Sequence, residues 1–183
     1  MKSRVLILFA HPALEKSRIN RRLIDAIRDL PGVMLHDLYQ EYPDFDVDVR
    51  REQELLLQHD IVVLQFPFYW YSSPALVKEW QDLVLEHGWA YGQDGRALQG
   101  KVLMVATSTG GSAASYSPAG SNRHALLDYL LPLRQTAALC GMSWLEPFVV
   151  SGTHALDEVA IGVEAQRYRQ AVEMLRDGTG ERR

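Results

Sequence analysis

Short apolar runs alternate along the chain with segments of helical spacing. Five runs of strand length are found at Val5–Phe9, Val33–Leu38, Ile61–Phe66, Val102–Ala106 and Pro147–Ser151. Between them, apolar side chains recur every three or four residues, which is the spacing of a helix with one buried face. These helical positions are Ile19, Leu23, Ile24, Ile27 and Leu30; Leu76, Trp80, Leu83 and Val84; Leu126, Leu127, Leu130 and Leu133; and Val159, Val163, Val172 and Leu175. The alternation of strand and helix predicts an α/β fold.

The apolar runs are nearly continuous and do not alternate with polar residues. A strand that helices cover on both faces needs apolar side chains at every position, so we predict a doubly wound, five-stranded parallel sheet with strand order 2-1-3-4-5. Pro132 interrupts a leucine-rich helical segment, and that helix either kinks there or begins a second time with proline in its first turn. The glycine-rich stretch Gly88–Gly100 indicates a long loop before the fourth strand.

Length and charge limit the organisation of the chain. Its 183 residues suit a single domain, predicted over residues 1–177, with a frayed tail at 178–183. A formal charge of -4 leaves no clustered basic surface, so no nucleic acid is predicted as a partner. The single cysteine, Cys140, excludes an intrachain disulfide and fits a reducing compartment. Because the apolar run ending at Ala10 is too short to span a membrane, we expect a cytoplasmic protein.

Three loops should hold the chemistry, because ligands of open parallel sheets bind beyond the carboxyl ends of the strands. The first loop reads AHPALEKSRIN and leads into a helix with Ser17 as its N-cap. It lacks the Gly-x-Gly-x-x-Gly and Walker patterns. Ser17, Arg18 and Asn20 suit a monophosphate, which hydroxyl and amide donors at a helix start can bind. An ordinary capped helix is the alternative explanation.

The second loop, PFYWYSSPALVKEW, contains four consecutive aromatic residues from Phe68 to Tyr71. Four aromatic rings in a row at the end of a strand must place some rings outside the core, where a flat heteroaromatic ligand can stack. Core packing alone is the alternative. The third loop, TSTGGSAASYSPAGSNRH, offers hydroxyls and backbone amides without charge, which suits the edge of a redox-active ring, although a plain surface loop has a similar composition.

The chain resembles the NAD(P)H:quinone oxidoreductase branch of the flavodoxin-like flavoproteins. The resemblance rests on A-H-P near the N-terminus, on W-Y-S-x-P-A-L-x-K-x-W and on T-G-G, and it covers nearly the whole chain. It is closest to the cytoplasmic ancillary subunits of bacterial glutathione-gated potassium-efflux systems, which look similar at HDLYQEYPDFDVD, REQELL, SSPALVKEW and the stretch from GWAYG to GK. This resemblance implies a flavodoxin-like fold, a bound FMN with FAD as the less favoured alternative, and a homodimer.

The resemblance also implies roles for particular residues. In that family the FMN phosphate is held by the counterparts of His11, Ser17, Arg18, Ile19 and Asn20, and the flavin ring by those of Phe68, Tyr69, Trp70, Tyr71, Ser108, Thr109, Gly110 and Gly111. Some ancillary subunits lack the second glycine of the third loop. Both glycines are present here, which favours an active flavoprotein.

A tyrosine and a histidine beyond T-G-G steady the reduced flavin in the quinone reductases. Tyr116 matches the tyrosine in its distance from Gly111. His124 lies eight residues after Tyr116, a longer spacing than the family's, so a surface or helix-start histidine is the alternative there. His11 is expected to contact the cofactor, and stabilising the turn before Pro12 is its alternative role.

The function predicted from these residues is hydride transfer from NAD(P)H through flavin to a quinone. A regulatory subunit that binds a potassium/proton antiporter, at the cytoplasmic face of the inner membrane, is a second hypothesis. A single-electron carrier of the flavodoxin type is a third, which the aromatic loop and the modest charge disfavour. No metal is predicted: histidines and cysteines lack ligand spacing, and the acidic stretch Asp44, Asp46 and Asp48 lacks the glycine and glutamate of a calcium loop.

Overall fold

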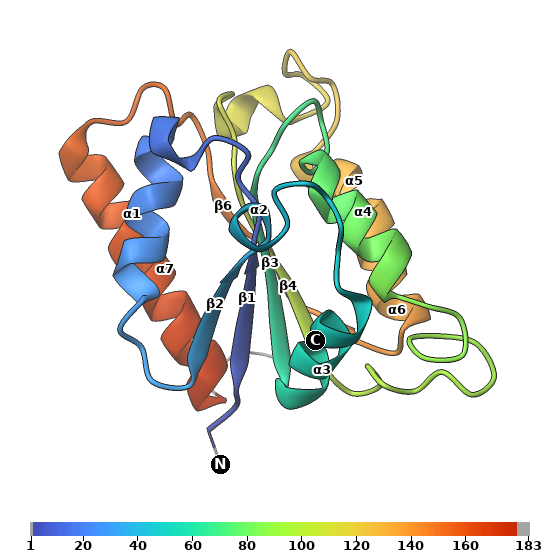
Figure 1. The fold of residues 1–183 in the computed structure, drawn as a ribbon. Coiled ribbons are helices and arrows are strands. Elements are labelled where there is room, and N and C mark those ends of the chain that lie inside the picture. Colours follow the sequence, from blue (N-terminus) through green and yellow to red (C-terminus); the bar gives the residue numbers. More distant parts are fainter. Residues whose placement is uncertain (1, 179–183) are drawn as a thin grey trace.

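The computed structural model describes residues 2–178, and its centre is a twisted parallel sheet (Figure 1). The strands are β1 (Val5–Phe9), β2 (Val33–Asp37), β3 (Ile61–Pro67), β4 (Val102–Ser108), β5 (Ser143–Trp144) and β6 (Phe148–Val150). They lie in the order β2-β1-β3-β4-β5, with β6 also paired to β4, and every pair is parallel. The predicted α/β class and strand order 2-1-3-4-5 are confirmed.

The fifth strand position is divided between two short strands. β5 pairs with the start of β4, where Ser143 lies opposite Val102, and β6 pairs with its end, where Phe148 lies opposite Ala106. Pro147 stands directly before β6, and it has no N–H to donate to the ladder. The predicted run Pro147–Ser151 therefore corresponds only to the second piece, and the sequence pattern did not predict β5.

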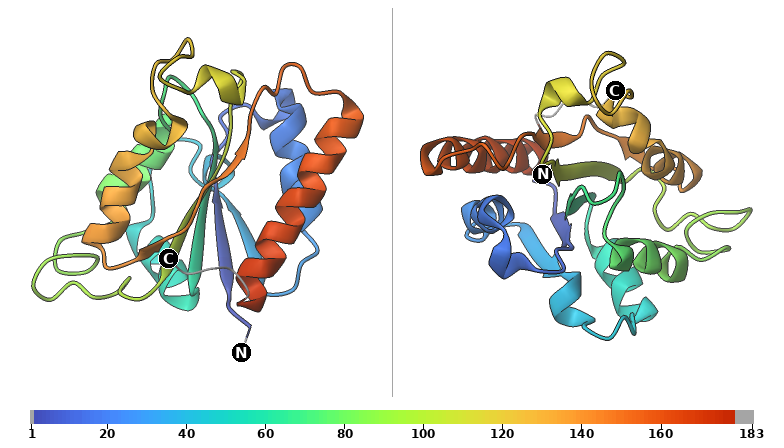
Figure 2. Two further views of the ribbon diagram at one scale, coloured as in Figure 1. Left: turned by 180° about the vertical axis from the view of Figure 1, so that it is seen from behind. Right: turned by 90° about the horizontal axis from the view of Figure 1, so that it is seen from above.

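Helices cover both faces of the sheet (Figure 2). The longer helices are α1 (Arg18–Ile27), α3 (Val49–Gln58), α4 (Ala75–Val84), α6 (Leu131–Leu139) and α7 (Glu158–Asp177); the short ones are α2 (Leu38–Glu41), α5 (Leu126–Tyr129), η1 (Leu14–Lys16) and η2 (Ala113–Ser115). α1 and α7 lie on one face, and α3, α4, α5 and α6 on the other. Leu6 and Leu8 pack into one core cluster and Val5, Ile7 and Phe9 into the other. Burial on both faces explains the continuous apolar runs.

Several helical positions predicted to face the core are exposed instead. On α7, Val159 and Val163 are 76% and 61% exposed, whereas Ile161, Ala165 and Tyr168 are buried. From Ile161 to Leu175 the buried residues of α7 are spaced by four, three, four and three, which is the spacing of one helix face. The two valines lie outside this buried face. Leu83 on α4 and Leu127 on α5 are likewise exposed, at 38% and 45%.

The proline in the leucine-rich segment starts a new helix. α5 ends at Tyr129, and α6 begins at Leu131 with Pro132 in its first turn, which confirms the second of the two alternatives for Pro132. The apolar pattern did not predict α3. Only Glu52 and Leu56 of that helix are buried, so it carries almost no apolar periodicity.

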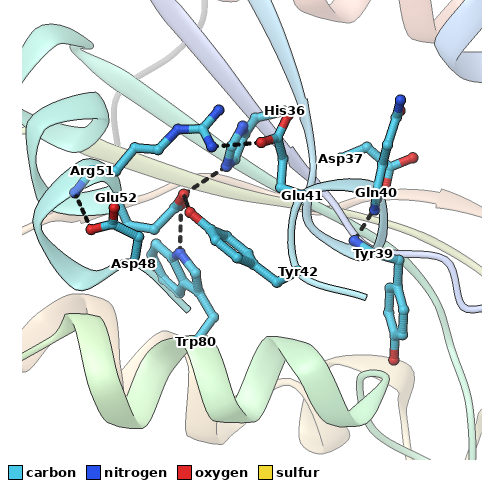
Figure 3. Close-up of polar contacts among 10 residues, drawn as sticks. All are labelled: His36, Asp37, Tyr39, Gln40, Glu41, Tyr42, Asp48, Arg51, Glu52 and Trp80. Atoms are coloured by element: carbon cyan, nitrogen blue, oxygen red, sulfur yellow. Dashed lines mark hydrogen bonds and ion pairs between the residues drawn. The ribbon is translucent and has the colours of Figure 1, made fainter. Parts of the chain in front are cut away.

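A fully buried carboxylate joins β2, α3 and α4 (Figure 3). Oε1 of Glu52 accepts hydrogen bonds from the Tyr42 hydroxyl at 2.6 Å and from His36 Nε2 at 2.7 Å, and Oε2 accepts one from Trp80 Nε1 at 2.8 Å. Burial by itself would raise the pKa of Glu52, but the hydrogen bonds and the neighbouring His36 together hold it below its ordinary value. A carboxylate that accepts three hydrogen bonds from the protein in place of water can remain ionised when it is buried.

The stretch Gly88–Gly100 lies at the amino ends of the strands, at the bottom of Figure 1. It folds back on itself through a hydrogen bond from Ala97 N to Trp89 O at 3.1 Å, and Ala90 and Leu98 anchor it in the core. The tail expected at 178–183 lies, apart from Gly178, outside the described residues. Gly178 ends α7 in the left-handed conformation, with φ of 75°.

Candidate functional site

The three predicted loops meet at the carboxyl ends of β1, β3 and β4, at the top of Figure 1. A cavity of about 330 Å³ lies between them. His11, Ser17 and Asn20 line it from the first loop, Phe68 and Tyr69 from the second, and Ser108 and Gly110 from the third. Residues predicted to bind one ligand are thus brought together from positions far apart in the sequence.

Asn20 links the first loop to the third. Ser17 caps α1 by accepting a hydrogen bond from the Asn20 amide at 3.1 Å, as predicted. The Asn20 side chain donates from Nδ2 to the hydroxyls of Ser17 at 3.2 Å and Ser108 at 3.0 Å. Its Oδ1 is buried and has no hydrogen-bond partner among the described residues. Because an unpaired buried acceptor costs free energy, this oxygen suits a ligand that brings a donor, such as a hydroxyl.

The side chain of Arg18, which lines the cavity, forms an ion pair with α7. Its Nη2 lies 2.8 Å from Oε1 of Glu158, at the start of α7, and both side chains are more than half exposed. The guanidinium is therefore already paired with a carboxylate. The backbone amides of Arg18 and Ile19, which have no partner within the helix, are the groups available to bind an anion.

His11 presents one ring nitrogen to the cavity as a donor. Its Nδ1 accepts a hydrogen bond from the Ala13 amide at 3.1 Å, which assigns the proton of the neutral ring to Nε2. Burial lowers the pKa of His11 below its ordinary value, against the opposing charge of Glu15. The neutral ring packs edge-on against Tyr69, with 6.0 Å between the ring centroids.

The aromatic loop contains a tight hairpin that turns its rings outward. Tyr69 and Ser72 exchange two backbone hydrogen bonds, each of 3.0 Å, and the two residues between them are left-handed, Trp70 with φ of 48° and Tyr71 with φ of 64°. Phe68 is 9% exposed and Trp70 is 93% exposed. The expectation that some of the four rings lie outside the core is confirmed, and the left-handed backbone at two aromatic residues marks a strained turn.

A second pocket, of about 340 Å³, adjoins the first and shares Phe68 with it. Trp70, Tyr71, Gly111 and Tyr116 also line it. Burial, with Tyr71 and Tyr129 nearby, raises the pKa of the Tyr116 hydroxyl, so this hydroxyl keeps its proton at neutral pH. Tyr116 thus offers a neutral hydrogen-bond donor beside an aromatic wall.

His124 lies outside the lining of this second pocket. It is exposed, and its ring meets the edge of Tyr129 at 5.9 Å between centroids. Asn122, which no motif singled out, lines the pocket together with Tyr116.

A fourth loop, residues 151–157, supports the third. Backbone hydrogen bonds run from Thr153 N to Thr109 O at 3.0 Å and from Gly152 N to Gly111 O at 2.8 Å. A Cβ on Gly110 would lie 2.7 Å from Nε2 of His154, so with any other residue at position 110 one of the two side chains must move. Thr153 and His154 line the first cavity and were not predicted, although the rule that ligands bind beyond strand ends applies equally to the loop after β6.

Two other properties concern residues 2–178 only. Within that range, no group of three or more histidine, cysteine, aspartate or glutamate side chains could hold a metal ion. None of the helices described there is long and apolar enough to cross a membrane.

An open parallel sheet with a ligand cavity beyond its strand ends defines a class of α/β proteins that bind nucleotides and related cofactors. A family model of the flavodoxin-like fold matches residues 3–172, and the chain belongs to this family, with a likeness to the NAD(P)H quinone reductases within it.

Three known proteins illustrate the relationship. The glutathione-regulated potassium-efflux system ancillary protein KefF of Klebsiella aerogenes is 44% identical over 166 residues, covering 91% of this chain and 93% of that protein. The general stress protein 14 of Treponema denticola, solved in complex with FMN, superposes with a TM-score of 0.89 at 35% identity, covering 94% of this chain and 99% of that one. An NADPH-quinone reductase from P. pentosaceus superposes with a TM-score of 0.84 at 32% identity, covering 92% and 96%.

Proposed function

We propose that the chain is an FMN-dependent NAD(P)H:quinone oxidoreductase. The observation that carries the proposal is the pair of adjoining cavities, one ending at the start of α1 and the other at Tyr116, with an aromatic wall along both. A bound FMN supplies a ring that accepts a hydride from one substrate and releases it to another. In the overall reaction, NAD(P)H and one proton are consumed and the quinone becomes a hydroquinone.

The residues around the first cavity fit the parts of FMN. The Ser17 hydroxyl and the amides of Arg18, Ile19 and Asn20 would hold the phosphate, since they are uncharged donors at a helix start. The unpaired Oδ1 of Asn20 would accept a hydrogen bond from a ribityl hydroxyl. His11 would contact the phosphate from the same loop. The ring would lie against Phe68, Tyr69, Trp70 and Tyr71 and meet Ser108, Gly110 and Gly111 at its edge, together with Thr109 between them.

The protein groups beside the ring would orient substrates and stabilise charge. Tyr116 would donate a hydrogen bond where negative charge develops during hydride transfer. His124 is the second catalytic candidate carried over from the family resemblance.

FMN is preferred over FAD because the first loop offers one helix start to one terminal phosphate. The relative solved with FMN supports this choice. Purified protein is expected to be yellow and to release FMN on denaturation, and to oxidise NADPH in the presence of a soluble quinone. Recovery of FAD, or absence of flavin binding under saturating FMN, would contradict the cofactor. A flavoprotein without quinone turnover would contradict the reaction alone.

A second function is supported by the similarity to KefF, whose name describes it as an ancillary protein of a potassium-efflux system. In this role the chain would bind the cytoplasmic domain of a potassium/proton antiporter and would lie at the cytoplasmic face of the inner membrane. The two roles are compatible. A pull-down with the isolated cytoplasmic domain of such an antiporter tests the regulatory role. We expect the domain to retain this chain.

A further inference from the structure

The main chain of Asn122 is held in place beside the pocket that contains Tyr116. The Asn122 amide donates to the carbonyl of Ser115 at 3.0 Å, and its carbonyl accepts from the Tyr129 hydroxyl at 2.9 Å. The two hydrogen bonds tie the end of the third loop to η2 and to α5. The backbone of Asn122 is therefore held in place beside the pocket.

The side chain of Asn122 is oriented by a neighbour in the aromatic loop. In this structure the Tyr71 hydroxyl donates to Oδ1 of Asn122 at 3.4 Å, at the long end of the hydrogen-bond range, so the amide oxygen faces Tyr71. Nδ2, with two protons, is then the atom left to meet a ligand in the pocket that both residues line. An amide N–H of this kind can donate a hydrogen bond to a ligand oxygen.

The chain changes direction directly after Asn122. Arg123 is left-handed, with φ of 61°, and its amide closes a turn on the carbonyl of Gly120 at 3.1 Å. A left-handed residue that is not glycine costs free energy and persists only where the surrounding structure holds it. After this turn, His124 lies against Tyr129 and is exposed, while Asn122 remains in the pocket.

We propose that Nδ2 of Asn122 donates a hydrogen bond to a carbonyl oxygen of the quinone, beside the Tyr116 hydroxyl. The inference rests on the proposed function and names a residue that contacts its acceptor. As the quinone is reduced, negative charge builds on its carbonyl oxygens, and a positioned donor stabilises that charge. The hydride that leaves NAD(P)H carries both electrons, and solvent supplies the second proton, because an amide does not ionise and keeps both of its own.

Asn122→Asp tests this contact because it preserves the shape of the side chain and removes both N–H donors. Gln135→Glu is the matched control, since it makes the same chemical change at an exposed amide on α6 outside the pocket. With FMN-loaded protein, stopped-flow spectroscopy measures flavin reduction by NADPH and then flavin reoxidation by menadione. We expect Asn122→Asp to slow reoxidation about tenfold and to change FMN affinity by no more than about twofold, while Gln135→Glu leaves both unchanged.

A second measurement does not depend on turnover. In uniformly ¹⁵N-labelled FMN-loaded protein, the side-chain amide signal of Asn122, assigned by its loss in Asn122→Asp, is expected to shift when menadione is added. If Asn122→Asp does not bind FMN, Asn122→Ser serves instead, because it is smaller than asparagine and still removes the amide.

Three results would decide against the inference or separate it from the proposed function. Parental reoxidation rates in Asn122→Asp together with an unshifted amide signal would overturn it. So would slow reoxidation in His124→Ala with normal reoxidation in Asn122→Asp, since the imidazole would then be the contacting group. A parent that binds FMN but does not reduce menadione would contradict the proposed function, and the amide signal alone would then decide whether Asn122 contacts a quinone.

Discussion

Gly110 and His154 lie against each other in the wall of the first cavity. A methyl group at Gly110 would come within 2.7 Å of the imidazole Nε2, so one of them must move. His154 is exposed and can turn away, which would change the cavity wall without disturbing the core. A substitution at Gly110 should therefore change ligand affinity more than the free energy of unfolding.

Gly110→Ala should weaken FMN binding about tenfold while changing the free energy of unfolding by less than about 1 kcal/mol. Flavin fluorescence quenching measures the binding, and urea unfolding measures the stability. Gly162→Ala on α7 is the control, because nothing lies within 4 Å of its added methyl group. It should leave FMN affinity unchanged and stabilise the helix by about 0.5–1 kcal/mol. Equal FMN affinity in the parent and in Gly110→Ala would show that this wall does not contact the cofactor.

Tyr116 acts through a single hydroxyl in the proposed mechanism. Tyr116→Phe keeps the ring, which packs edge-on against Phe68 at 5.8 Å between centroids, and deletes one donor. We expect little change in FMN affinity and a ten- to hundredfold slower hydride transfer, about 1.4–2.8 kcal/mol, measured as flavin bleaching by NADPH in a stopped-flow instrument.

Tyr39→Phe serves as the control for Tyr116→Phe, because Tyr39 lies on α2 and lines neither cavity. If Tyr116→Phe reduces its flavin and turns over quinone at parental rates, the hydroxyl has no catalytic role. Normal reduction with slow quinone turnover would move that role to the second half-reaction.

At the scale of elements, the Glu52 cluster connects segments that the apolar pattern does not connect. His36 lies in β2, Glu52 in α3 and Trp80 in α4. The Glu52 carboxylate therefore links two helices to the edge strand of the sheet (Figure 3). If the Glu52 carboxylate loses its charge, its three buried hydrogen-bond donors face a weaker acceptor. Breaking a buried, hydrogen-bonded charge in this way is among the more destabilising single changes in proteins.

Glu52→Gln should lower the free energy of unfolding by about 3–4 kcal/mol at pH 7, measured by urea unfolding with tryptophan fluorescence. The folded-state pKa of Glu52 lies below its ordinary value of 4.5. Its stabilisation is thus complete above that ordinary pKa and is lost as pH falls through the lower folded value. The difference between parent and variant should therefore shrink in acid.

Glu54→Gln changes an exposed carboxylate of the same helix and should alter stability by less than about 0.5 kcal/mol at any of these pH values. A difference between parent and Glu52→Gln that stays constant from pH 7 to strongly acid conditions would show that Glu52 is not ionised in the folded protein.

At the scale of the whole molecule, the family resemblance implies that two copies complete each other's active sites. Gly88–Gly100 lies at the opposite end of the sheet from the two cavities of the candidate site in its own chain (Figure 1), so it could reach such a cavity only in a partner. We expect a homodimer with a two-fold, isologous interface. Light scattering should give twice the chain mass of 20.7 kDa, and a mass of 20.7 kDa at working concentration would contradict the prediction.

The local pattern of side chains predicted the strand order of the sheet and the edge at which the three loops meet. Runs such as Val5–Phe9 are apolar at every position because helices cover both faces, and parallel strands bring the loops after Phe9, Phe66 and Ala106 to one edge. Ser17 could be predicted as a helix cap because its partner, the Asn20 amide, is three residues away.

Contacts between distant residues were decided only in the tertiary structure. The partners of Glu52 come from three other parts of the chain, so a charge in a polar helix gives no local sign that it is buried. The same holds for His154 against Gly110, and for Asn122, which lines the pocket directly before a left-handed turn at Arg123. Periodicity records which side of an element is buried, but the identity of what lies against it depends on how the elements pack together.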